Sequence, residues 1–61
     1  MPWTKYNYPV SMKNLPELVR NKAIDIANAM LEESKMEEGL IIATAISQAK
    51  KWAKKNYPSI N

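Results

Sequence analysis

Residues 19–31 read VRNKAIDIANAML, and the spacing of their apolar side chains predicts an α-helix. Four of these side chains share the i, i+4, i+7, i+11 spacing of one helical face: Val19, Ala23, Ile26 and Met30. With their apolar neighbours they cover an arc of about 160° at 100° per residue, and polar residues fill the remainder. Because Pro16 suits a helix start, we expect a helix over residues 16–33.

The same spacing recurs further along the chain and predicts a second helix over residues 36–56. Its apolar stripe contains Ile42, Ile46, Ala49 and Ala53. Ser34 and Glu37 have the S-x-x-E spacing of a capping box, so we expect this helix to begin beside Glu37. Pro58 disfavours helical geometry in the residue before it, which sets the end. Gly39 lies in the first turns of this helix and lowers the stability of the helix by about 1 kcal/mol relative to alanine.

A short connection between two amphipathic helices makes them antiparallel neighbours. The chain of 61 residues is expected to form a single small helical domain over residues 1–61, of the all-α class: an antiparallel helical hairpin. Residues 1–15 form an irregular N-terminal segment without a sustained period, and residues 57–61 a frayed tail. The N-terminal segment carries Trp3, Tyr6 and Tyr8. Aromatic side chains bury large areas, so we expect this segment to pack on the hairpin.

The composition argues against catalysis. The chain has no His and no Cys, so it lacks the commonest general base, a thiol nucleophile and zinc thiolates. We therefore expect no enzymatic activity, no catalytic or metal-binding residues, no cofactor and no small-molecule substrate. Four glutamates flank the inter-helix connection: Glu32, Glu33, Glu37 and Glu38. They do not match an EF-hand loop, and Glu37 and Glu38 suit the positive end of a helix dipole.

Four lysines near the C-terminus form the strongest local charge feature. The formal net charge is +3 at pH 7, and residues 50–61 hold four lysines and no acidic residue. These lysines gather on one side of the second helix: Lys50, Lys51, Lys54 and Lys55. They complement the negative end of the helix dipole and are also a candidate site for nucleic acid or another polyanion. Trp52 should face the core, which argues against a base-stacking platform there.

The wide apolar arc of the first helix predicts contact with more than one partner. A two-helix seam is narrow, so a further surface should cover Ile24 and Leu31. The N-terminal aromatic residues and a second copy of the chain are the two alternatives. Ile24 and Leu31 are therefore candidate protein-interaction residues, and we expect a non-enzymatic interaction module that forms a homodimer or binds a protein partner. Nucleic-acid binding remains the alternative function.

The chain shows no membrane-spanning or secretory pattern. Its longest wholly apolar run, residues 40–43, is far shorter than the ~20 residues that cross a bilayer. The N-terminus lacks the apolar region of a secretory signal, which predicts a cytoplasmic protein. Attachment of the basic amphipathic helix to a membrane surface is a weaker alternative, because the core competes for the same apolar face.

The order and spacing of several short motifs resemble the N-terminal module of the YdaT-type small bacterial proteins. They lie within about residues 1–55: Met1-Pro2-Trp3, Tyr8-Pro9, Lys13-Asn14-Leu15, Val19-Arg20-x-Lys22-Ala23-Ile24, Ala27-Asn28-Ala29, Glu37-Glu38-Gly39 and Ala49-Lys50-x-Trp52-Ala53. That family is uncharacterised, so the resemblance implies a helical cytoplasmic bacterial protein and no activity. Members can carry a second, C-terminal domain, and this chain would correspond to the first module alone.

The chain is also similar, over less of its length, to the ChaB family of putative cation-transport regulators. This similarity consists of Leu15-Pro16-x-x-Val19 and of an alanine-rich, tryptophan-bearing second helix that ends in lysines. The chain lacks the second Leu-Pro of that family and the His-Ala-Gln that follows it. Some ChaB-like members are treated as DNA-binding, which adds to the polyanion alternative. Neither resemblance assigns a functional residue.

Overall fold

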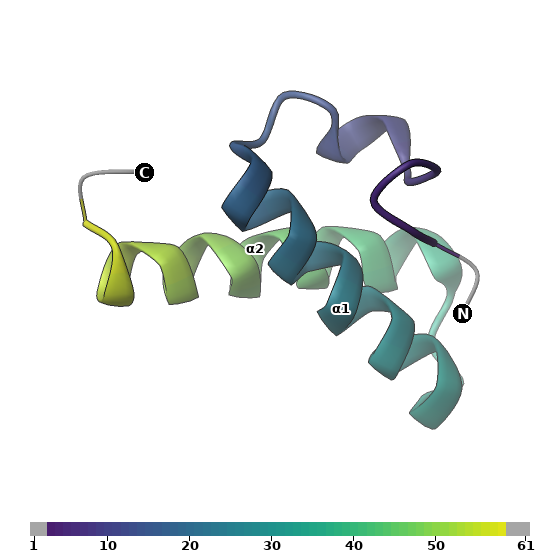
Figure 1. The fold of residues 1–61 in the computed structure, drawn as a ribbon. Coiled ribbons are helices and arrows are strands. Elements are labelled where there is room, and N and C mark those ends of the chain that lie inside the picture. Colours follow the sequence, from purple (N-terminus) through teal and green to yellow (C-terminus); the bar gives the residue numbers. More distant parts are fainter. Residues whose placement is uncertain (1–2, 59–61) are drawn as a thin grey trace.

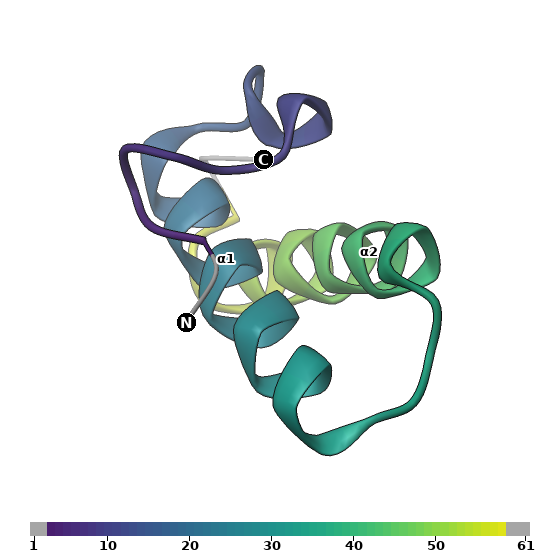
Figure 2. The ribbon, with the colours of Figure 1, turned by 90° about the vertical axis from the view of Figure 1, so that its right-hand side faces the viewer.

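The computed structural model describes residues 3–58 and contains two packed α-helices (Figure 1). A 3-10 helix, η1 (Val10–Met12), precedes α1 (Glu17–Glu33) and α2 (Glu38–Asn56). The helices run in opposite directions and cross obliquely, with the N-terminal segment on one side of them (Figures 1 and 2). The predicted all-α helical hairpin is confirmed. The predicted tail lies only partly within the described residues, because residues 59–61 fall outside them.

The connection between the helices differs from the predicted capping box. Ser34 is extended and ends α1, and its Oγ accepts a hydrogen bond from the backbone N–H of Met36, 3.0 Å away. Glu37 precedes α2 in an extended conformation and makes no side-chain cap. The predicted capping box is therefore not formed, whereas α2 begins at Glu38, directly beside Glu37 and two residues after the outer predicted bound at residue 36. A serine hydroxyl can bond the backbone two residues later, and this local turn replaces the reciprocal cap.

The helix interface is formed by rows of residues four apart. On α1 the buried row is Val19, Ala23 and Ala27, and on α2 it is Ile41, Ala45, Ala49 and Ala53. The predicted rows instead included Ile26, Met30, Ile42 and Ile46, which are only half-buried. Interdigitation of i±4 ridges is typical of helices that cross at about 50°, in agreement with the oblique crossing in Figure 1. The many alanines let the two backbones approach closely.

The N-terminal segment completes the core. Thr4 and Asn7 form an isolated antiparallel bridge, and η1 then directs Met12 inward, where it has no exposed surface. Trp3 and Tyr8 are half-buried and pack against the core, as the sequence predicted for the aromatic segment. Tyr6 is the exception, because 85% of it is exposed. The segment therefore acts as a third layer over the hairpin.

Gly39 has no structural requirement within this chain. Its φ is negative, and a Cβ added there would meet nothing within 4 Å. We therefore expect Gly39→Ala to raise the free energy of unfolding by about 0.4–1 kcal/mol, because alanine restricts the unfolded chain. Chemical denaturation monitored by circular dichroism measures this change. A loss of stability would show that the glycine is needed in the native state.

Within residues 3–58, neither helix has both the length and the hydropathy that a bilayer crossing requires.

Candidate functional site

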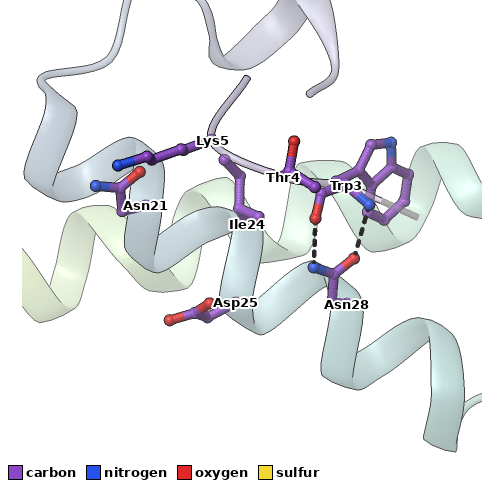
Figure 3. Close-up of a pocket in the computed structure, with 7 residues that line it drawn as sticks. All are labelled: Trp3, Thr4, Lys5, Asn21, Ile24, Asp25 and Asn28. Atoms are coloured by element: carbon purple, nitrogen blue, oxygen red, sulfur yellow. Dashed lines mark hydrogen bonds between the residues drawn. The ribbon is translucent and has the colours of Figure 1, made fainter. Parts of the chain in front are cut away.

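An open pocket lies between the N-terminal segment and α1. Its volume is about 360 Å³. Both elements line it, through Trp3, Thr4, Lys5, Asn21, Ile24, Asp25 and Asn28 (Figure 3). Lys5 and Asp25 are exposed, and their ammonium group and carboxylate are the two charged groups among the residues that line this pocket.

Asn28 holds the N-terminal segment against α1 at this pocket. Its Nδ2 donates to the carbonyl oxygen of Trp3 at 2.9 Å, and its Oδ1 accepts from the N–H of Trp3 at 3.2 Å (Figure 3). The side chain is 2% exposed. The amide pairs with both backbone groups of one residue, as a neighbouring strand would. Its hydrogen bonds are thus directed to the chain itself, which gives Asn28 a structural role.

Arg20 makes a second attachment of the segment, to residues that are closer in the sequence. Its Nη1 donates to the Leu15 carbonyl oxygen at 3.0 Å and, at the longer distance of 3.5 Å, to that of Lys13. The guanidinium carbon lies 5.1 Å from the centroid of the Tyr8 ring, a cation–π distance. Arg20 therefore connects three parts of the N-terminal segment to the first turn of α1.

The predicted polyanion-binding lysines all lie on the solvent side of α2. Lys50, Lys51, Lys54 and Lys55 are exposed. Residues four apart share a helical side, so Lys50 and Lys54 form one row and Lys51 and Lys55 another. The second row lies nearer to Trp52. The structure thus leaves all four ammonium groups accessible, and polyanion binding stays a prediction.

Trp52 connects these lysines to α1. It is half-buried against the core. The centroid of its ring lies 5.6 Å from the centroid of the Tyr57 ring, and the angle between the two ring planes is 59°. The Nζ of Lys22 lies 5.1 Å from the Trp52 ring centroid. Lys22 belongs to α1, so the antiparallel packing adds a fifth lysine to the basic end of the hairpin.

The two candidate interaction residues differ in their surroundings. Ile24 is covered by the N-terminal segment within a single chain and is 5% exposed. Leu31 is half-buried and packs against the edge of the core. Ile24 therefore offers almost no surface to a partner.

The helical period places Asn28 and Lys22 on the polar side of α1 and predicts a role for neither of them. Asn28 lies only 40° beyond Ile24 at 100° per residue, and this place at the margin of the apolar arc is a signal for a buried polar residue. Nothing local marks Lys22, because its partner Trp52 lies on the other helix. Within residues 3–58 the structure contains no group of three His, Cys, Asp or Glu side chains that could hold a metal ion.

These features define a small all-α domain in which a helical hairpin carries an N-terminal covering segment. Over 53 residues, 87% of its length, the chain is 58% identical to the uncharacterised protein YdaT of Bacillus subtilis (strain 168). The YdaT-type resemblance is thus confirmed. The aligned region spans 35% of that relative's length. No family model matches the chain, and no solved structure matches it; the ChaB resemblance receives no support.

Proposed function

We propose that this chain is a non-enzymatic protein-interaction module of a bacterial cell. The observation that supports this proposal is that one side of the hairpin, opposite the N-terminal segment, is not covered by any other part of the described chain. Residues two apart in a helix lie on nearly opposite sides, so Ile26 and Met30 face away from Ile24 and Asn28. Ile26 and Met30 are half-buried against the core and keep part of their surface exposed, and the same is true of Trp52 of α2. A chain of this size gains stability when such apolar surface is buried against a partner.

Two observations support the non-enzymatic part of the proposal. The chain has neither His nor Cys. The hydroxyl oxygen of Thr4 at the pocket accepts the backbone N–H groups of Tyr6 and Asn7, at 3.2 and 3.1 Å. That hydroxyl thus stabilises a turn.

Small secreted domains commonly depend on disulfides, and the absence of cysteine favours a cytoplasmic location.

The proposal is tested by substituting the uncovered side. We expect Ile26→Gln to abolish capture of specific proteins from a bacterial lysate, and to abolish binding of the captured protein once it is purified. Val10→Gln is the matched control, because Val10 is 84% exposed and lies on the N-terminal segment. Circular dichroism establishes that both variants fold. Capture that is insensitive to Ile26→Gln, or the absence of both capture and self-association, would contradict the proposal.

The second candidate function, binding of nucleic acid or another polyanion, is supported by the exposure of the four C-terminal lysines. If all four contact phosphates, the logarithm of the binding constant should fall with the logarithm of salt concentration with a slope of about −3 for single strands. Fluorescence anisotropy with a mixed-sequence oligonucleotide measures this slope. The absence of binding at low salt would exclude this candidate.

A further inference from the structure

The uncovered side of the hairpin, here called the open face, has an apolar middle. On α1, Ile26 and Met30 form one row with Lys22. Lys22 reaches Trp52 of α2, which places this row and the tryptophan on the same side of the molecule. Ile26, Met30 and Trp52 are each half-buried in the single chain. The N-terminal segment is bonded to Arg20 and Asn28 of α1, and this segment lies on one side of the helix pair (Figure 2).

The basic end of the open face surrounds Trp52. Lys22 lies 5.1 Å from the tryptophan ring. Lys55 follows Trp52 by three residues and therefore shares its side of α2, and Lys51 lies one turn before Lys55. Both of these lysines are exposed. Three positive charges thus border the apolar middle at the end remote from the inter-helix connection.

The acidic end of the open face lies at the connection. Glu33 follows Met30 by three residues, which places it on the same side of α1. Glu37 directly precedes α2, and both glutamates are exposed. Along α2, Glu37 and Lys55 are separated by about 27 Å at 1.5 Å per residue. The face therefore changes from negative to positive along its length.

From this charge order we infer that the open face joins two copies of this chain in an antiparallel pair with twofold symmetry. The inference rests on the proposed interaction function and specifies its partner. A twofold axis through the apolar middle sets the basic end of each copy against the acidic end of the other. Ile26, Met30 and Trp52 are then buried against their symmetry equivalents. A partner of uniform negative charge, such as a nucleic acid, would be repelled by Glu33 and Glu37.

Charge exchange tests this pairing directly. We expect sedimentation to show a concentration-dependent dimer for the wild-type chain. Lys51→Glu with Lys55→Glu makes both ends of the face acidic, and should raise the dimer dissociation constant by about tenfold or more at low salt. Glu33→Lys with Glu37→Lys makes both ends basic and should have a similar effect. An equimolar mixture of the two variants should restore dimers, because each face then meets its charge opposite.

A matched control separates this pairing from other effects of charge. Lys50→Glu with Lys54→Glu makes the same charge change on the row remote from Trp52 and should leave the dimer intact. Oligonucleotide binding through the four lysines would instead be weakened by either lysine pair. A monomeric wild-type chain, or variants that fail to associate when mixed, would overturn the inference. The proposed function would survive that outcome if Ile26 still governs binding of a different, purified protein.

Discussion

Met12→Ala should lower the free energy of unfolding by about 2–5 kcal/mol, the usual cost of replacing a fully buried methionine with alanine. Met12 has no exposed surface and is the largest fully buried side chain, although it belongs to the N-terminal segment. A domain of this length has a total stability of about 3–9 kcal/mol. We therefore expect a large part of the variant population to be unfolded at room temperature. Urea denaturation monitored by circular dichroism measures the loss.

Two controls lie in the same segment. Met12→Leu keeps most of the volume and should cost less than about 1.5 kcal/mol. Val10→Ala changes the first residue of the same 3-10 helix, which is 84% exposed, and should alter stability by no more than about 0.5 kcal/mol. If Met12→Ala behaves like Val10→Ala, the N-terminal segment does not form part of the core in solution.

Asn28→Leu should lower the free energy of unfolding by about 2–3 kcal/mol. The substitution removes both hydrogen bonds to Trp3 and leaves the N–H and carbonyl groups of that residue without their partner. Because the attachment is local, we also expect the Trp3 amide proton to lose its protection from hydrogen exchange. Urea denaturation measures the stability, and nuclear magnetic resonance measures the exchange of that proton.

Two further substitutions determine whether the bonding of Asn28 is responsible. Asn21→Leu makes the same change at a half-buried pocket residue and should cost less than about 1 kcal/mol. Asn28→Asp retains an acceptor for Trp3 but sets a carboxylate against its carbonyl group. A protonated carboxyl could donate there, so its folded-state pKa should be raised. This variant should approach the wild-type stability below about pH 4 and lose stability as the pH rises. An unchanged Trp3 exchange rate in Asn28→Leu would contradict the role of Asn28.

Both helices were predictable because their signal is local. The 3.6-residue period of the apolar side chains predicts helices over residues 16–33 and 36–56. The observed bounds of α1 and α2 are Glu17–Glu33 and Glu38–Asn56, so each predicted end lies within two residues of the observed one. The start of α2 was not predictable to the residue. Ser34 has two local hydrogen-bonding options, a reciprocal cap with Glu37 and a turn with Met36, and the structure uses the turn. The difference in free energy between such options is too small for a motif to resolve.

The candidate site was predictable in part. Exposure of the four C-terminal lysines followed from their separation from the apolar stripe. The roles of Asn28 and Lys22 were not predictable, because Asn28 bonds a residue 25 positions away and Lys22 contacts a residue of the other helix. A helical period shows that a side of α1 is apolar. It does not show which neighbour covers that side.

The order of residues along the chain was sufficient for the two amphipathic helices and for the separation of glutamates from lysines, because both depend on contacts and charges a few residues apart. Tertiary packing selected the alanine rows as the helix interface and placed Ile24 beneath the N-terminal segment. It also left Ile26, Met30 and Trp52 on the open side. These choices depend on how two helices and a short segment fill space together. Close packing is a property of the assembled surfaces, and no single helix carries that information.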